Sequence, residues 1–285
     1  WVCGSADFMA GSFFRWSRYE EAGRRAVRDE HGRFPGKESL PFRAGFMDRP
    51  VIDEYGRLLR NWLTQLGVKV DNPKQTFRQI NLTHDVDAPF YMRILRNIAR
   101  GIKERKNIRK LLQAKFGPLE NDPFYTFPWL LNENKQVQNH FGKERCSSIF
   151  FFKAGGNEFR DKPRYNLYSR DIRELFKLIS ASGGIFGLHS SYQAGKCPDI
   201  IPEEKICLEK AVGTEITANR HHFLRSREPE DMVLLEQAGI TDDYTMGYAD
   251  IAGFRLGTTR PVRWIDVTQR RLSSLLLHPL TVMDS

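Results

Sequence analysis

The sequence predicts an α/β fold, in which strands alternate with helices and form a parallel sheet or barrel. Three observations support this prediction. The chain has 285 residues, which suits one barrel-sized domain. Apolar runs of strand length, at 148–152 and 184–188, are each followed by a helical pattern. Polar side chains directly follow several predicted strands, which is where α/β folds place their active sites.

Residues 1–75 precede this pattern and are expected to form a separate accessory segment. Glycines and prolines between 28 and 46 indicate loops. A helical pattern follows Pro50, and its apolar face contains Ile52, Tyr55, Leu58, Leu59, Trp62 and Leu63. Residues 76–285 are expected to form the main domain.

The main domain begins with a predicted strand at 79–83 and a basic helix at 91–115. Apolar periodicity and helix-end residues then predict the other elements. We expect strands at 148–152, 184–188, 215–217, near 240, at 262–265 and at 275–278, and helices at 169–181, 202–212 and 229–238.

The chain is basic, with a formal net charge of +9. Much of this charge lies in the run 103–110, which we expect to be a solvated helix face away from the candidate site. Ile108, Leu111 and Leu112 should pack inward. Anionic glycans, nucleic acid or a membrane surface are the alternative partners for such a run.

Neither a nucleic-acid motif nor a membrane span accompanies this charge. A span needs about 18 consecutive apolar residues, and the sequence has no such run. Because no signal-like segment opens the chain, we expect a cytoplasmic protein. The oligomeric state is left open.

Candidate chemistry gathers at the predicted strand ends. Asp85 and Asp87 stand two residues apart, so both side chains face the same side of a strand. One carboxylate can bind a metal while the other acts as a base, and His189 and His222 from other strands can complete a three-ligand site. A solvated capping turn is the alternative for the two aspartates, and His221 competes with His222.

Five segments resemble, in the right order, the motifs of NodB-type polysaccharide deacetylases (carbohydrate esterase family 4). Thr83-His84-Asp85-Val86-Asp87 is similar to their Thr-Phe-Asp-Asp motif. The other four are 187–192, 219–225, 243–248 with 253–258, and Leu277-His278. The resemblance covers roughly 78–285 and is closest to an uncharacterised bacterial branch with a His-Asp-Val-Asp motif.

The resemblance implies a distorted (β/α) barrel of about seven strands and a hydrolase that removes N- or O-linked acetyl groups from a carbohydrate. It implies Asp85 as general base, with Asp87 and His189 as ligands of a divalent metal. That metal is expected to be zinc, with cobalt, manganese or nickel as alternatives. Arg220 would orient Asp85, and His278 would be the general acid.

The segments also depart from the family pattern. Gln193 stands where the family has its second motif histidine, and Val86 separates the usual adjacent aspartates. We therefore expect His222 to be the third metal ligand. A catalytically weak glycan-binding protein is the main alternative, ahead of a phosphohydrolase and a nucleic-acid-binding module. Substrate contacts are expected from Tyr192, Asp243, Arg255 and Trp264, for which core packing or an internal salt bridge is the alternative.

Overall fold

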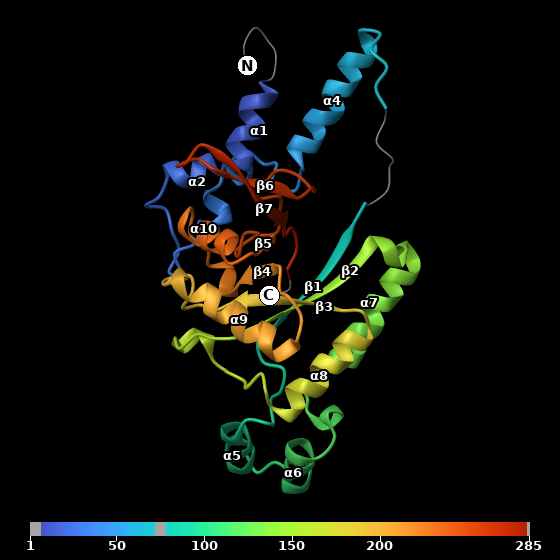
Figure 1. The fold of residues 1–285 in the computed structure, drawn as a ribbon, viewed down its shortest axis with the longest axis vertical. Helices are drawn as coiled ribbons and strands as arrows, with labels where there is room; N and C mark the ends of the chain where they lie inside the picture. Colours follow the sequence, from blue (N-terminus) through green and yellow to red (C-terminus); the bar gives the residue numbers. More distant parts are fainter. Residues whose placement is uncertain (1–6, 72–77, 284–285) are drawn as a thin grey trace.

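A computed structural model describes residues 7–71 and 78–283. Seven strands within these residues form one sheet in the order β1-β2-β3-β4-β5-β7-β6 (Figure 1). All neighbouring pairs are parallel except β6 and β7. The predicted α/β class and strand number are confirmed, although the sheet is mixed rather than wholly parallel. The strands are β1 (Ile80–Val86), β2 (Cys146–Phe152), β3 (Ile185–Ser190), β4 (Ala218–His221), β5 (Asp242–Met246), β6 (Val262–Asp266) and β7 (Arg271–Pro279).

The sheet curls into a half-barrel. In a flat sheet β1 and β4 would lie about 14 Å apart, because β2 and β3 separate them. Yet Arg220 of β4 donates hydrogen bonds to Thr83 Oγ1 at 2.8 Å and to Asp85 Oδ1 at 2.9 Å on β1. The ring of Tyr244 on β5 likewise lies 5.5 Å from that of Phe151 on β2. The curl therefore brings together side chains from strands that are not neighbours.

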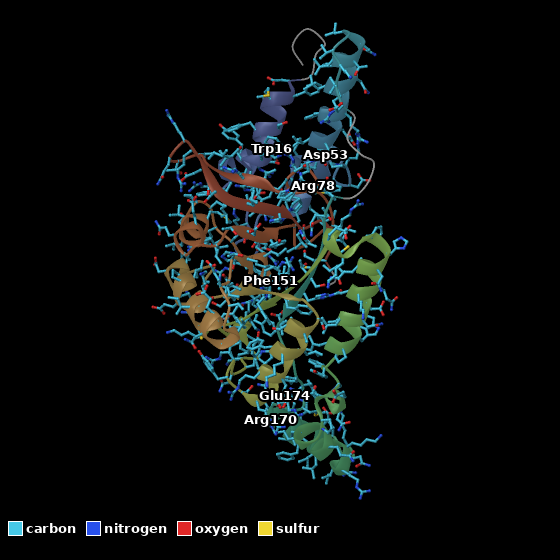
Figure 2. The ribbon with its side chains drawn as sticks, turned by 45° about the vertical axis from the view of Figure 1, so that its right-hand side comes forward. Trp16, Asp53, Arg78, Phe151, Arg170 and Glu174 are labelled. Carbon is cyan, nitrogen blue, oxygen red and sulfur yellow. The ribbon has the colours of Figure 1, made fainter. Side chains whose placement is uncertain are left out.

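Strand β2 is apolar on both faces because both of its faces are covered. Phe150 and Phe152 of β2 belong to the main core under the helices, whereas Phe151 packs in a separate cluster with Tyr244. Phe151 is labelled at the middle of the molecule in Figure 2. Gly187 of β3 makes room for this inner packing, since a Cβ there would lie 2.5 Å from the ring of Phe151. Parallel strands buried on both sides produce the continuous apolar runs seen in the sequence.

Helices cover the outer face of the sheet. α8 (Arg170–Ala181) begins after Ser169, whose Oγ accepts a hydrogen bond from the backbone N–H of Ile172 at 3.4 Å. Its buried residues recur at three- and four-residue spacing, as expected for one helical face. No helix in the described ranges has the length and apolar composition needed to cross a bilayer. The other covering helices are α7 (Phe127–Phe141), α9 (Ile201–Val212) and α10 (Glu230–Gln237).

Several predicted boundaries were wrong. The strand expected at 215–217 is β4 at Ala218–His221, and the one expected near 240 is β5 at Asp242–Met246. The carbonyl of Thr217 accepts hydrogen bonds from the N–H groups of Thr241 and Asp242, so residue 217 lies directly before β4 and beside the start of β5. α7 was not anticipated. The register of neighbouring strands decides such ends, and local composition does not contain it.

The basic segment forms two helices rather than one. α5 (Leu95–Lys103) and α6 (Ile108–Phe116) make a hairpin at one end of the molecule, opposite α1 and α4 (Figure 1). Leu111 packs inward as predicted, but Ile108 and Leu112 are exposed. Asn107 explains the break, because its side chain accepts a hydrogen bond from the N–H of Lys110 and so starts a second helix.

The N-terminal segment packs against the loops and edge of the half-barrel. Arg255 forms an ion pair with Glu21 at 2.6 Å, and Thr258 donates to Asp53 at 2.7 Å. The predicted helix after Pro50 is α4. The expected domain boundary between 75 and 76 lies outside the described residues. The helices of this segment are α1 (Phe8–Trp16), α2 (Tyr19–Gly23), α3 (Leu40–Arg43) and α4 (Val51–Gln65).

Candidate metal centre

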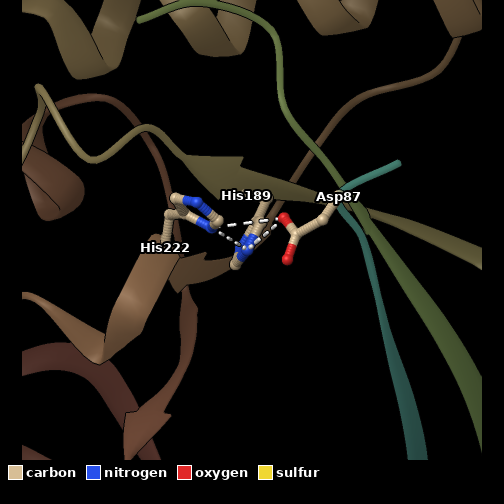
Figure 3. A group of neighbouring side chains, drawn as sticks. All are labelled: Asp87, His189 and His222. Atoms are coloured by element: carbon tan, nitrogen blue, oxygen red, sulfur yellow. Dashed lines mark hydrogen bonds and ion pairs between the residues drawn. The ribbon is translucent and has the colours of Figure 1, made fainter. Parts of the chain in front are cut away.

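Three side chains from three strand ends converge on one point (Figure 3). Asp87 follows β1, His189 lies near the end of β3, and His222 follows β4. His189 Nε2 and His222 Nδ1 are 3.0 Å apart. Asp87 Oδ1 lies 3.3 Å from the first nitrogen and 3.2 Å from the second. Both rings are buried, while Asp87 remains partly open to solvent.

Backbone carbonyls fix the tautomer of both histidines. His189 Nδ1 lies 2.8 Å from the carbonyl oxygen of Arg220, and His222 Nε2 lies 3.0 Å from that of Arg160. A carbonyl only accepts hydrogen bonds, so these two nitrogens carry the protons. In neutral rings, His189 Nε2 and His222 Nδ1 then present lone pairs. This arrangement is typical of metal-ligating histidines.

The donor set fits a divalent cation. Two facing lone pairs 3.0 Å apart repel each other unless a cation or proton lies between them. Asp87 Oδ1 points at the same place, is buried, and has no hydrogen-bond donor among the described residues. Tetrahedral zinc with bonds of 2.0–2.2 Å separates its ligand atoms by about 3.3 Å. The three observed distances come close to this value, so these residues could hold a metal ion.

The electrostatics of the cluster favour a shared positive charge. Burial would raise the pKa of Asp87, but hydrogen bonds and charge from the protonated forms of His189 and His222 hold that pKa below its ordinary value. Burial likewise would lower the pKa of His189, but the nearby Asp85 and Asp87 carboxylates raise it. Each group therefore stabilises the charged form of its neighbour, and a metal cation satisfies the same field.

A strained turn supports His222. Phe223 and Leu224 directly after it have φ of 61° and 51°, in the left-handed region. This conformation costs a non-glycine residue about 1–2 kcal/mol. Arg33 of the N-terminal segment donates to the carbonyl of Phe223 at 2.8 Å, and the Phe223 ring packs edge-on against His222. Backbone strain of this kind is concentrated at functional sites, and these contacts help to maintain it here.

Asp85 lies beside the cluster as half of an ion pair. Its Oδ1 accepts from Arg220 Nη1 at 2.9 Å, while its Oδ2 lies 4.0 Å from His189 Nε2. Arg220 is buried, stacks over Phe151 and also donates to Thr83. The guanidinium is therefore fixed, and it leaves one Asp85 oxygen facing the cluster.

Lys153 is a neighbour of the site that the sequence analysis missed. Its buried ammonium lies 3.7 Å from Asp87 Oδ1 and donates to the carbonyls of Asp161 and Pro163. Burial lowers the pKa of Lys153, against the opposing effect of Asp87. The signal was present, because a lone lysine directly follows the apolar run of β2 at the same edge of the sheet.

His278 does not line the cavity around the cluster. Its Nε2 lies 2.7 Å from Asp242 Oδ1, and its ring stacks on Tyr244. Asp243, the next residue along β5, bonds to Asn219 and Thr245. The imidazole of His278 is therefore engaged by a side chain of β5 and by the ring of Tyr244.

The expected substrate contacts are also engaged elsewhere. Tyr192 is buried, with its hydroxyl 3.1 Å from His31 Nδ1 and Arg225 over its ring. Arg255 forms its ion pair with the N-terminal segment, and Trp264 is 1% exposed. Neither these three residues nor Asp243 is among the described residues that line the cavity.

Neither Gln193 nor His221 takes the place of His222 in the cluster. Gln193 accepts a hydrogen bond from the N–H of Asn157 at 2.7 Å and is not part of the cluster. His221 points away, with its Nε2 3.4 Å from Asp231 in a fully buried pair. Of the two adjacent histidines, His222 is therefore the one that joins Asp87 and His189.

The cluster lies in a cavity of about 570 Å³, within the range of small-molecule sites. Polar groups from β1, β3 and β4 form its floor, and Leu130 of α7 with Leu280 beyond β7 provide apolar walls. A ligand here would meet a few oriented polar groups against an apolar wall. The other lining residues are Thr83, His84, Asp85, Thr126, Arg220, Phe223, Leu224, Val282 and Met283.

Comparisons with known proteins add little to this picture. Residues 3–68 match a family of unknown function (DUF7033). No curated protein matches the sequence. A solved structure of a candidate polysaccharide deacetylase from Mycobacterium smegmatis is similar over 73% of this chain, at 16% identity and a TM-score of 0.41. The chain spans 60% of that protein's length. The fold and the site therefore rest on the strand order and the side-chain geometry.

Proposed function

We propose that this chain is a metal-dependent hydrolase that removes N- or O-linked acetyl groups from a carbohydrate. One observation carries the proposal: lone pairs of Asp87, His189 and His222 converge at a cavity, and the Asp85–Arg220 pair lies beside them. The carbohydrate substrate rests on the resemblance of five segments to NodB-type deacetylases. A bound divalent cation would polarise the acetyl carbonyl and lower the pKa of water at the site.

Asp85 is the proposed base. The Oδ2 atom that faces the cluster can accept a proton from the attacking water, because Arg220 occupies only Oδ1. Arg220 stabilises the ionised carboxylate and fixes its orientation. The water oxygen bonds to the acetyl carbon, and acetate leaves when the bond to nitrogen or oxygen breaks.

The leaving group needs a proton, and the protonated Asp85 can return the one it accepted. The resemblance assigns this step to His278, but that ring is bonded to Asp242 and lies outside the cavity lining. We therefore place both proton transfers at Asp85. Lys153 adds a fixed positive charge next to Asp87 and is held by two carbonyls.

Zinc is the proposed metal, with cobalt, manganese or nickel as alternatives. Two imidazoles and one carboxylate form a ligand set that suits zinc, and three protein ligands leave a fourth position for water and substrate. The spacing of 3.0–3.3 Å between the ligand atoms agrees with tetrahedral bonds.

The test joins metal content with acetate release. Protein purified without chelator should contain about one divalent ion per chain by elemental analysis. It should release acetate from N-acetylglucosamine oligomers or from a chromogenic acetyl ester. Dialysis against a chelator should abolish this release, and added zinc should restore it. Full activity in the metal-free protein would refute the mechanism, and metal binding without hydrolysis would support the glycan-binding alternative.

A further inference from the structure

The α5–α6 hairpin holds nearly all of the net charge of the protein. Residues 93–116 contain nine basic and one acidic side chain. Of the chain's 44 basic and 35 acidic side chains, 35 and 34 remain for all other residues. A net charge of +8, out of +9 for the whole chain, therefore lies in one small projection at the end of the molecule (Figure 1).

The hairpin has its own small core. Leu111 and Ala114 of α6 pack with Met92 and Ile98, and Gly101 allows the helices to approach, since a Cβ there would lie 2.8 Å from Leu111. The hairpin is joined to the main domain where Arg93 pairs with Asp171 at 3.3 Å and where Asp122 accepts from the backbone at 91 and 92. These contacts hold the hairpin in place, and none of them covers its outer face.

That outer face carries an apolar stripe. Ile108, Leu112 and Phe116 recur every fourth residue of α6, so they lie in one row. All three are exposed, Ile108 to 58% and Phe116 to 77%. Ile102 is also exposed at the end of α5, and every residue from 102 to 110 is open to solvent.

The basic side chains around this stripe are mostly without acidic partners. Among the described residues, Arg93 and Lys106 are the two basic groups of the hairpin that form an ion pair within 4.0 Å. The field of the others is not neutralised within the protein. They are Arg96, Arg100, Lys103, Arg105, Arg109, Lys110 and Lys115.

The combination of charge and apolar surface selects the partner. An anionic glycan or a nucleic acid would be held mainly by the basic groups, and of the stripe only the ring of Phe116 could stack on it, so Ile108 and Leu112 would stay exposed to water. A bilayer that contains anionic lipids offers phosphate groups next to acyl chains. An interfacial helix matches both layers when it has basic residues beside an apolar face.

We propose that the α5–α6 hairpin docks this protein on an anionic lipid surface. Ile108, Leu112 and Phe116 enter the region between headgroups and acyl chains, and the surrounding lysines and arginines contact lipid phosphates. Helix α5 begins eight residues after Asp87, so a short segment connects the docked hairpin to the strand end that carries the candidate site. The proposal does not depend on the metal chemistry.

Sedimentation with vesicles tests the proposal on the whole chain. The protein should bind vesicles of phosphatidylcholine with 30% phosphatidylglycerol and should not bind pure phosphatidylcholine. Arg105→Gln should weaken partitioning about fivefold, which corresponds to about 1 kcal/mol for one basic residue near the surface. The triple variant Ile108→Ser/Leu112→Ser/Phe116→Ser should weaken it at least tenfold without any change of charge.

A matched control distinguishes the effect of the hairpin charges from the effect of the net charge of the protein. Lys135, Lys143 and Lys177 are exposed on α7, the turn after it, and α8. Their change to glutamine removes three charges outside the hairpin and should leave vesicle binding within twofold of the unchanged protein. Equal loss in this control, no binding to anionic vesicles, or full binding by the serine variant would each overturn the proposal. Thermal unfolding should show that all variants remain folded.

Discussion

The metal centre and the α5–α6 hairpin use charge in opposite ways. At the centre, charged side chains are partly or wholly buried and have named partners, as in the pair of Asp85 and Arg220. In the hairpin, most charges are exposed and lack an acidic partner. The paired, buried charges of the centre hold particular atoms in place. The exposed charges of the hairpin create an electrostatic field that acts over a Debye length, about 8–10 Å at ordinary ionic strength.

This difference predicts a different response to salt and to mutation. A buried pair is screened weakly, but loss of one partner leaves the other uncompensated and is costly. An exposed cluster is screened strongly, and each of its members contributes a similar small share. Chemistry should therefore depend on single residues at the centre, whereas binding should depend on the number of charges in the hairpin.

The largest expected effect is the loss of a metal ligand. His189→Ala removes one of three converging donors and should reduce zinc affinity by more than about 100-fold, because even the partners of ligands contribute 10- to 100-fold. Titration with zinc, followed by calorimetry, measures this change. His140→Ala, at an exposed position of α7, is the matched control and should leave the affinity unaltered. Unchanged affinity in His189→Ala would place the ion elsewhere.

The next largest effect distinguishes a role of Asp85 as general base from a role as metal ligand. Asp85→Asn should keep the metal, because Asp85 lies outside the group of converging atoms, but it should lose about 10²- to 10⁴-fold in hydrolysis with the base removed. Elemental analysis and acetate release on the same sample measure both quantities. If Asp85→Asn loses the metal as well, Asp85 is a ligand and the two aspartates have exchanged roles.

The same contrast explains what the sequence could predict. The metal ligands could be predicted because the ends of parallel strands meet at one edge of a sheet. Asp87, His189 and His222 each follow or end a strand that the sequence predicts, so they were expected to lie together. The contact of His278 with Asp242 could not be predicted, because it depends on the register of β5 against β7, which places Asp242 opposite Leu276, two residues before His278. The strained turn after His222 depends on Arg33, nearly 200 residues away in the chain.

The prediction of the fold was limited in the same way, by contacts between residues that are distant in the sequence. Apolar runs and helix caps predicted β2, β3 and α8 closely, because each carries its own pattern. The break inside 91–115 was missed because the apolar pattern continues through both helices. The helices fold back on each other at Gly101 and Leu111, and only that contact decides which apolar residues are buried. The exposed stripe is therefore a tertiary property.

A buried carboxyl near the centre should make the stability of the protein depend on pH. Burial raises the pKa of Glu204 on α9 from 4.5 to about 7, although it accepts a hydrogen bond from the N–H of Ser191. Because the folded-state pKa is the higher one, its contribution is fully present below about pH 4.5 and is lost as pH rises through about 7. Glu204→Gln should remove this loss, which corresponds to roughly 3 kcal/mol.

Urea unfolding at pH 4 and pH 8 measures the change. The variant should match the unchanged protein at pH 4 and exceed its stability at pH 8. Glu104→Gln, an exposed position between α5 and α6, should have little effect at either pH. A parallel decline of stability in Glu204→Gln and in the unchanged protein would show that another group is responsible.

The smallest expected effect is also the sharpest test of the separation between the two regions. Arg105→Glu/Lys106→Glu reverses two exposed charges in the turn between α5 and α6, and this turn contributes no residue to the cavity around Asp87. Hydrolysis of a small neutral acetyl ester should stay within about twofold, because such a substrate has no charge for the hairpin to attract. Hydrolysis of a long anionic glycan or a lipid-bound substrate should fall, and added salt should reduce the difference. The two rates, measured at low and high ionic strength, give this comparison directly. A large loss on the small ester would mean that the hairpin reaches the site, and residues 91–116 would then belong to the substrate cleft.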